Sequence, residues 1–308
     1  MSEPLSAVYG APPAALAQPP PGARQVSPLV PAAEPLEGLA PGSLSAAVIV
    51  APPGTLERRY VLAAMLRALS PGAPLTVLAP KDKGGSRLRK ELEAFGCQVE
   101  EVGRQHQRIC HTTRPAAPAG LEAAIAAGGP QRIAPISTGG EGLWTQPGVF
   151  SWDRDDPGSQ LLVAALPALS GQGADLGCGI GVLARAVLTS TKVTRLDLVD
   201  LDRRALDAAR RNVEDPRAGF HWADARSGPG LSGLDFVVMN PPFHDAGQED
   251  KALGQAFIRR AHAMLRTGGV LWMVANRHLP YEAVLGEQFA RVTPRGDGKG
   301  FKIYEARK

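Results

Sequence analysis

From Leu44 onward, hydrophobic residues group into short runs and into sets with helical spacing. The apolar run at 46–50 predicts a buried strand, and apolar residues three or four positions apart over 56–69 predict a helix. A Ser-Pro-Gly turn follows, then an apolar run at 75–78 and a second helical pattern at 87–95. This alternation of strands and helices predicts an α/β fold with a mostly parallel sheet.

The same succession returns near the C-terminus, where the pattern predicts strands at 236–239 and 270–274 and helices at 256–265 and 281–289. The two stretches also match residue by residue at two places. Met65-Leu66-Arg67, followed by Pro71-Gly72, matches Met264-Leu265-Arg266, followed by Thr267-Gly268. Gly103, followed by Arg108-Ile109-Cys110, matches Gly300, followed by Lys302-Ile303-Tyr304. We interpret this as an internal duplication of the second half of one α/β domain. A chance similarity between two ordinary strand–helix–strand units is the alternative.

These patterns divide the chain into four parts. Residues 1–43 are rich in Pro and Ala with few large apolar side chains, so we expect a mostly disordered tail. Residues 44–115 form the partial copy, and 116–146 are expected to be a linker with a short helical segment. Residues 147–308 hold the complete copy, because only this copy has a first half in front of the duplicated part.

Composition narrows the class of protein. The chain is 44% hydrophobic and 21% charged, with no apolar run long enough to span a bilayer, so we expect a globular protein without a membrane partner. The three cysteines are scattered, which favours a cytoplasmic location and argues against a metal site or disulfides. No element indicates a dimer interface, so the oligomeric state stays open, with a monomer favoured.

Positive charge gathers in the middle of the chain. Residues 44–135 carry 12 Lys and Arg against 7 Asp and Glu, a net charge of +5. A solvated basic face and a surface that contacts nucleic acid phosphates are both compatible with this excess.

A glycine-rich turn links a strand to a helix at the start of the complete copy. It runs from Asp175 through Gly177, Gly179 and Gly181, and glycines at such a turn let backbone N–H groups approach a ligand closely. Val182 stands where a dinucleotide-binding loop would have its third glycine. The spacing therefore favours a ligand without a pyrophosphate, such as one carrying an amino acid group and a ribose.

Acidic residues follow the next two predicted strands. Asp200 ends the strand at 195–199, where we expect it to accept both ribose hydroxyls, with Leu201 packing on one face of an adenine. Asp202 is favoured as the N-cap of a helix at 203–212. Asp224 ends the strand at 220–223 and is placed to accept a hydrogen bond from an adenine amine, a simple turn residue being the alternative. With the glycine loop, these acids resemble the S-adenosylmethionine site of Rossmann-like methyltransferases.

The fourth strand of this copy ends in Asn240-Pro241-Pro242-Phe243. In that superfamily such a motif marks methylation of a nitrogen conjugated to a planar system. The Asn240 side-chain oxygen and the Pro241 carbonyl can each accept one N–H of the amine, and Phe243 offers a stacking face for an extruded base. A rigid turn is the alternative, because Ala51-Pro52-Pro53-Gly54 has the same shape without the amide or the ring. Whether His244 and Asp245 act in catalysis stays open.

The C-terminal half resembles the bacterial ribosomal RNA guanine-N2 methyltransferases, most closely those acting on 16S rRNA of the small subunit. The resemblance rests on Pro147-Gly148-Val149-Phe150-Ser151, on Asp156 with Gly158-Ser159-Gln160-Leu161-Leu162, on Asn240-Pro-Pro-Phe with His244 and Asp245, and on residues 274–281, Val-Ala-Asn-Arg-His-Leu-Pro-Tyr.

The resemblance implies a Rossmann-like methyltransferase fold, a mostly parallel seven-stranded sheet with helices on both faces, preceded by a partial, degenerate copy that holds the ribosomal substrate. It also implies S-adenosylmethionine as cofactor, with Asp175, Gly177, Gly179, Gly181, Asp200, Leu201, Asp224 and Asn240 binding it and Asn240, Pro241 and Phe243 in catalysis. A large-subunit enzyme, an N6-adenine or protein glutamine-N5 methyltransferase and a non-catalytic RNA-binding assembly factor remain as alternatives.

Overall fold

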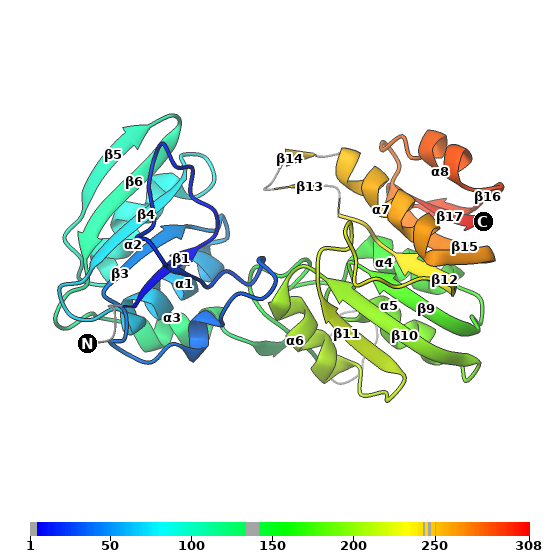
Figure 1. The fold of residues 1–308 in the computed structure, drawn as a ribbon, viewed down its shortest axis with the longest axis horizontal. Coiled ribbons are helices and arrows are strands. Elements are labelled where there is room, and N and C mark those ends of the chain that lie inside the picture. Colours follow the sequence, from blue (N-terminus) through cyan, green and yellow to red (C-terminus); the bar gives the residue numbers. More distant parts are fainter. Residues whose placement is uncertain (1–4, 134–141, 243, 246–247, 250) are drawn as a thin grey trace. The chain divides into compact units, whose positions relative to one another are not determined.

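The computed structural model describes residues 5–133, 142–242, 244–245, 248–249 and 251–308. The chain divides into two compact units, one comprising Met1–Gln131 with Gln146–Gly148 and the other Arg132–Thr145 with Val149–Lys308. Each unit is built around its own β-sheet (Figure 1). Within the described part of the chain, no helix combines the length and the apolar character that a membrane span requires.

The first unit contains a six-stranded sheet in the order β2-β1-β3-β4-β6-β5. Strands β2, β1, β3 and β4 run parallel, while β6 and β5 add an antiparallel hairpin at one edge. The strands are β1 (Ser6–Tyr9), β2 (Arg24–Gln25), β3 (Ala46–Val50), β4 (Pro74–Pro80), β5 (Glu100–Arg104) and β6 (Gln107–Thr113).

The two faces of this sheet are covered in different ways. One face packs against helices, and the other is covered by a chain segment that contributes Leu16, Ala17 and Ala23 to a small cluster with Val48 and Leu78. The helices are α1 (Thr55–Ala68), α2 (Leu88–Ala94) and α3 (Leu121–Gly128), with short 3-10 turns η1 (Leu36–Gly38) and η2 (Gly85–Arg87).

The expectation of a disordered tail over residues 1–43 is wrong for the described residues 5–43. β1 lies beside β3 inside the sheet, and Ala7, Val26 and Leu36 are buried in the main core of the unit. The composition misleads because a segment with few apolar residues cannot form a core alone. Here those few residues add to a core formed by the rest of the unit, which offsets the cost of ordering the segment.

The predicted linker at 116–146 also departs from the structure. Its helix, α3, packs against α1, and Leu121 and Ala124 belong to the core of the first unit. Gly128 comes so close to α1 that a Cβ there would lie 2.5 Å from the Cβ of Tyr60. Residues up to Gln131 are therefore part of the first unit rather than a spacer.

The second unit contains the predicted seven-stranded sheet, in the order β11-β10-β9-β12-β15-β17-β16. All neighbours are parallel except at β17, which is antiparallel to both β15 and β16. The strands are β9 (Gly171–Leu176), β10 (Val193–Asp200), β11 (Ala218–Trp222), β12 (Leu234–Met239), β15 (Leu265–Asn276), β16 (Arg291–Gly298) and β17 (Phe301–Arg307).

Helices cover both faces of this sheet because its central strands are apolar on both sides. Val237 and Met239 point into a core with α7 and α8, whereas Phe236 and Val238 point into a second core with α4, α5 and α6. The helices are α4 (Pro157–Ala165), α5 (Val182–Val187), α6 (Arg203–Asn212), α7 (Lys251–Met264) and α8 (Glu282–Gln288). Two further pairs of short strands are β7 (Gln131–Ile133) with β8 (Leu143–Thr145), and β13 (His244–Asp245) with β14 (Gln248–Glu249).

The two sheets support the predicted duplication. The succession β3-α1-β4-α2-β5-β6 in the first unit matches β12-α7-β15-α8-β16-β17 in the second, and the corresponding strands take the same order in the sheets. Ile109 and Ile303 occupy the same register, two residues into β6 and β17. Gly103 does not match Gly300, because the turn equivalent to Lys299-Gly300 is Gln105-His106, and all four residues have positive φ.

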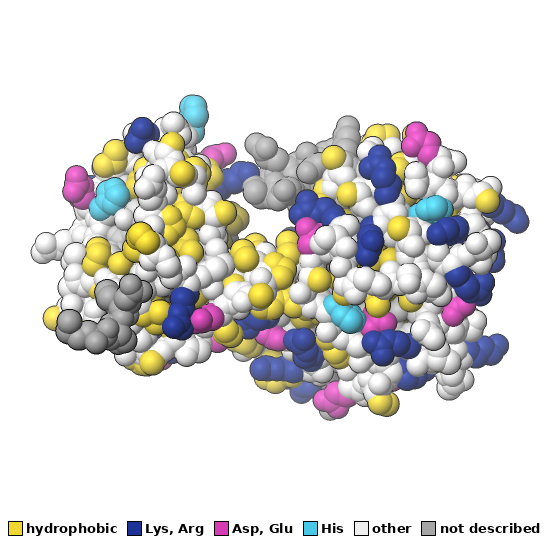
Figure 2. Space-filling view, in the orientation of Figure 1, with side chains coloured by type: hydrophobic (Ala, Val, Ile, Leu, Met, Phe, Trp, Pro, Cys, Tyr) yellow, Lys and Arg dark blue, Asp and Glu magenta, His cyan; other side chains and the backbone are white. Residues whose placement is uncertain are grey.

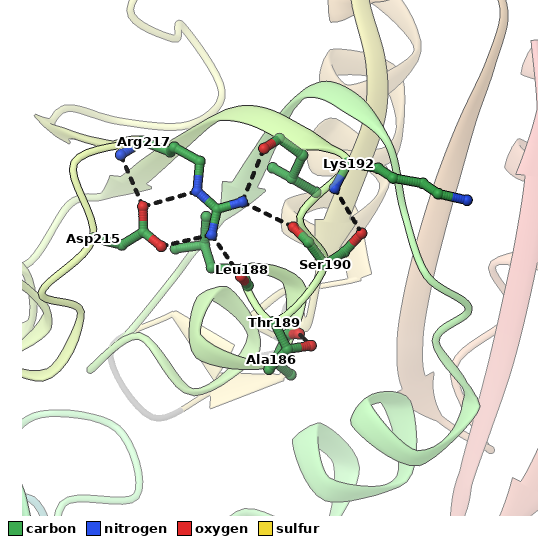
Figure 3. A network of polar contacts seen from close by, with 8 residues as sticks. Ala186, Leu188, Thr189, Ser190, Lys192, Asp215 and Arg217 are labelled. Carbon is green, nitrogen blue, oxygen red and sulfur yellow. Dashed lines mark hydrogen bonds and ion pairs between the residues drawn. The ribbon is translucent and has the colours of Figure 1, made fainter.

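A partly exposed polar network lies at the amino-terminal edge of the second sheet (Figure 3). The Arg217 guanidinium, just before β11, pairs with Asp215 and donates to the carbonyls of Leu188, Ser190 and Val193. It thus ties the loop after α5 to the start of β11. Since ligands of open parallel sheets bind at the carboxyl ends of the strands, this network stabilises the edge opposite the candidate site.

Candidate active site

A pocket in the second unit lies at the carboxyl ends of β9 and β12, next to the start of α4. The space between its walls, including the part open to solvent, is about 580 Å³. It is lined by Leu143, Phe150, Ser151, Arg154, Asp155, Asp156, Ser159, Gln160, Gly177, Cys178, Gly179, Ile180, Val182, Leu183 and Asn240.

The glycine loop forms one wall of this pocket. Gly177, Gly179 and Gly181 have φ values of 71°, 53° and 89°, a region that favours glycine. A Cβ at Gly179 would meet no atom within 4 Å, so this side of the loop is open for a ligand. A Cβ at Gly181 would lie 2.8 Å from Val213, so that glycine serves close packing against the end of α6 instead.

Asp175 lies beneath the loop, at the end of β9, and is 0% exposed. Neither of its carboxylate oxygens accepts a well-formed hydrogen bond from the residues that the structure describes. Burial, together with the nearby charge of Asp200, raises the pKa of Asp175 to about 8. A buried carboxyl of this kind is costly to ionise unless a positively charged ligand lies close by.

Asp200 connects the end of β10 to the glycine loop. One of its oxygens accepts the Gly179 N–H at 2.8 Å and the other accepts the Asp202 N–H at 2.8 Å. Burial raises the pKa of Asp200 to about 6, although these N–H donors act in the opposite direction. The carboxylate is thereby fixed in orientation, and each oxygen keeps a lone pair for a further donor.

The residues around Asp200 are also held in place. The Leu201 carbonyl accepts the indole N–H of Trp222 at 2.8 Å, which links the end of β10 to the end of β11. Asp202 is the N-cap of α6, as predicted, and accepts the Arg204 N–H at 3.0 Å.

Asp224 lies apart from the pocket, two residues beyond the end of β11. Both of its carboxylate oxygens are bound by the guanidinium of Arg226, which holds the pKa of Asp224 below its ordinary value. An adenine amine would have to share this carboxylate with Arg226. This pairing could not be predicted from the sequence, since local ion pairs of this kind depend on the turn geometry.

Asn240 follows β12 and faces the glycine loop across the pocket. Its Nδ2 donates to Asp156 Oδ2 at 2.8 Å and to Ser159 Oγ at 3.0 Å. The same Asp156 oxygen caps α4 by accepting the Ser159 N–H at 2.6 Å. Because both N–H groups of the Asn240 amide are directed at α4, its Oδ1 is the atom presented on the opposite side.

The remainder of the predicted catalytic motif is only partly described. Pro241 is buried and Pro242 is exposed. Phe243 lies outside the described residues, and of His244 and Asp245 only the backbone is described, as the strand β13.

Several pocket residues were not singled out as ligands from the sequence. Phe150 is 58% exposed, an unusual position for a large aromatic side chain, and it lines the pocket together with Arg154 and Gln160. The only signal for these residues was their place in the segment before the glycine loop, where sequence patterns alone do not show which side chains turn inward.

Three comparisons relate the chain to known proteins. Residues 141–305 match the family described as methyltransferase small domain. The chain is 31% identical to the ribosomal RNA small subunit methyltransferase C of Pseudomonas aeruginosa (strain LESB58) over 272 residues, covering 87% of this chain and 80% of the relative. It is 32% identical to the protein of that name from Chromohalobacter salexigens, covering 80% and 73%.

Among solved structures, the T. thermophilus 16S rRNA N2 G1207 methyltransferase in complex with AdoMet and guanosine superposes with a TM-score of 0.74. Its sequence is 27% identical, and the match covers 89% of this chain and 75% of that one. The likeness therefore extends over both units rather than over the second alone.

Proposed function

The chain belongs to the methyltransferase small domain family and to the ribosomal RNA small subunit methyltransferase C proteins within it, and we propose that it transfers a methyl group from S-adenosylmethionine to the exocyclic N2 amine of a guanine in 16S rRNA. The observation that carries this proposal is the Asn240 amide, which lines the same pocket as Gly177 and Gly179 and presents an oxygen acceptor there.

The pocket suits S-adenosylmethionine, which supplies an electrophilic methyl group on a positively charged sulfur. Asp175 and Asp200 have raised pKa values because they are buried, and a cationic ligand stabilises their ionised forms. We assign the Asp200 oxygens to the ribose hydroxyls and the open side of Gly177 and Gly179 to the amino acid portion. Leu201 would pack on the adenine, and the Asp224–Arg226 pair would lie near its amine.

The reaction needs help at the nucleophile, because the lone pair of the guanine N2 amine is delocalised into the ring. Asn240 Oδ1 and the Pro241 carbonyl would each accept one N–H, which favours a pyramidal nitrogen with its lone pair directed at the methyl group. No strong base is required, since the nitrogen proton becomes acidic once the methyl group is attached. Phe243 and the exposed ring of Phe150 are candidates for stacking on the extruded base.

We further propose that the substrate is 16S rRNA within the small ribosomal subunit, that the first unit helps to hold it, and that the chain acts in the cytoplasm as a monomer. The base most consistent with the likeness is the guanine named for the T. thermophilus enzyme, G1207.

The test is transfer of labelled methyl groups to isolated 30S subunits, 50S subunits and naked rRNA, followed by mapping of the modified base. We expect N2-methylguanine at one position of 16S rRNA in 30S subunits. Asn240→Ala should abolish transfer while S-adenosylmethionine binds within a few-fold of wild type. Labelling of 23S rRNA, or full activity of Asn240→Ala, would contradict the proposal.

A further inference from the structure

A fully buried arginine lies at the end of β3 in the first unit. Arg58 of α1 is 0% exposed, and its guanidinium makes five hydrogen bonds. Nε and Nη2 donate to the two oxygens of Glu91, each at 2.7 Å. Nη1 donates to the carbonyls of Pro52 at 3.2 Å and Pro53 at 2.7 Å, and Nη2 also reaches Thr55 Oγ1 at 3.5 Å. These bonds match the five N–H groups of a guanidinium.

The surroundings are shaped to this planar group. Gly84 has φ of 97°, and a Cβ there would lie 2.3 Å from Arg58 Nη1 and 2.9 Å from its central carbon. Glu91, which faces the other edge of the guanidinium, is buried as well. A carboxylate on one edge, two carbonyls on the other and a glycine whose missing Cβ leaves room for the group together form a complete guanidinium-binding site.

The internal duplication relates this site to the candidate active site of the second unit. Ala51-Pro52-Pro53 ends β3 as Asn240-Pro241-Pro242 ends β12, so the Pro52 carbonyl takes the place of the Pro241 carbonyl. Counting back from the matched Met-Leu-Arg sequences at the helix ends, Arg58 takes the place of Phe257. The Phe257 side chain has no N–H to donate, and its ring packs beside the glycine loop, 3.5 Å from a Cβ placed on Gly177.

We infer that the first unit contains a site for a guanidine edge at the position where the second unit receives the target amine, and that Arg58 fills this site from within the chain. The N–C–N donor edge of a guanidinium has the same arrangement as N1, C2 and N2 of guanine. This copy consequently admits no extruded base, and any contact it makes with RNA uses its outer surface. The comparison with Pro241 rests on the proposed function, whereas the test below measures unfolding and not methyl transfer.

The test uses the full chain with Arg58→Ala, which empties the site. All four tryptophans lie in the second unit, so a transition seen by circular dichroism but not by tryptophan fluorescence belongs to the first unit. We expect that transition to fall by roughly 10 °C or more, and 20 mM methylguanidinium to raise it again by about 4 °C. Equal concentrations of methylammonium or NaCl should have less than a quarter of this effect.

The matched control is Arg58→Ala with Glu91→Gln, in which methylguanidinium should give no specific recovery because its carboxylate partner is gone. Wild type should show none either, since its site is filled. If Arg58→Ala does not fold without an added cation, the yield of refolded chain is measured instead. The inference then predicts a higher yield with methylguanidinium than with methylammonium. Equal responses to the two cations, or recovery retained in the double variant, would overturn the inference.

Discussion

The orientation of one amide decides what the pocket can do. An asparagine presents either a donor or an acceptor, depending on which way its amide is turned, and here Asp156 and Ser159 bind the Asn240 nitrogen. The acceptor needed for an amine is thus set by two side chains at the start of α4. Asp156 also caps that helix, so the helix start and the proposed catalytic amide are fixed by one carboxylate oxygen.

We predict that Asp156→Ala lowers kcat for 30S methylation by about 10- to 100-fold, because the Asn240 amide is then free to turn. Loss of the cap should also cost about 1 kcal/mol of stability. Ser159→Ala is the matched control. It removes the weaker acceptor but keeps the cap, which uses the Ser159 backbone N–H, so kcat should fall about 3-fold at most. Single-turnover kinetics distinguish the two, and an unchanged kcat in Asp156→Ala would exclude this role.

Asp175 makes the stability of the ligand-free chain depend on pH. The folded-state pKa values of about 8 for Asp175 and about 6 for Asp200 lie above the unfolded value of about 4, so the folded chain binds more protons between these limits. The stability that these two groups contribute is therefore fully present at pH 4 and below, and it is lost progressively as pH rises from about 4 to 8.

We predict that Asp175→Asn, which cannot ionise, flattens this dependence. The difference in Tm between pH 5 and pH 8 should be smaller than in wild type by roughly 5 °C, as measured by circular dichroism without S-adenosylmethionine. Using the difference cancels other titrating groups, which the variant retains. Parallel pH curves for the two proteins would show that Asp175 is already ionised in the folded chain.

The sequence could predict the site residues that follow from local rules. Glycines with positive φ and acids at strand ends are both set within a few residues, and Gly179, Asp200 and Asn240 lie together as those rules imply. Arg226 on Asp224 and the exposed ring of Phe150 could not be predicted, since each depends on how a loop folds over the sheet.

At the scale of elements, a short strand is held against the glycine loop by the last residue of a helix. Asn212 ends α6, and its Oδ1 accepts the Trp144 N–H of β8 at 2.8 Å. Its Nδ2 donates to the carbonyls of Trp144 and Ile180, both at 2.9 Å. Since Leu143 and Ile180 line the pocket, this side chain joins two of its walls.

We predict that Asn212→Asp weakens S-adenosylmethionine binding about tenfold, because two carbonyls then face a carboxylate instead of an N–H donor. Isothermal titration calorimetry measures the affinity. Arg185→Ala is the control, because the Arg185 side chain donates to the Asn212 main-chain carbonyl, at 3.3 Å on the surface, and leaves the Asn212 amide untouched. The affinity of this variant should stay within twofold of wild type. Equal affinities of the two variants for S-adenosylmethionine would show that the attachment of β8 by Asn212 does not contribute to binding.

Helices and strands could be predicted where their sequence pattern was local. The prediction failed where the position of a segment depends on its packing against distant parts of the chain. The helix at 203–212 and the strand at 46–50 agree with α6 and β3 to the residue, because their apolar spacing and stop signals are strong. β1 and α3 gave weak signals over few residues. Each is held by packing against a sheet or helix distant in sequence, which composition and periodicity do not report.

At the scale of the whole molecule, two copies of one topology differ in what occupies their strand ends. One presents the Asn240 amide to a pocket, and the other has Arg58 bound to Glu91. Figure 2 shows Lys and Arg side chains spread across the displayed face of the second unit, and many of its arginines are paired, as in Arg203 with Asp207 and Arg217 with Asp215. Charge available for an RNA backbone is therefore also to be sought in the first unit, whose residues 44–131 carry 11 Lys and Arg against 7 Asp and Glu.

Lys81 and Arg104 are the strongest candidates there. Both are exposed, and both lie by the β5–β6 turn, since the Lys81 N–H donates to the His106 carbonyl at 3.0 Å and Arg104 is the last residue of β5. Their edge of the sheet corresponds to the site edge of the second unit.

We predict that Lys81→Glu with Arg104→Glu raises KM for 30S subunits about 10-fold or more and lowers the salt dependence of binding by about two counterions. S-adenosylmethionine affinity should not change. Lys192→Glu with Arg291→Glu, two exposed changes at the amino-terminal edge of the second sheet, is the charge control, because it changes the net charge by the same amount. An equal rise in KM from this control would assign the effect to net charge instead of to this edge of the first unit.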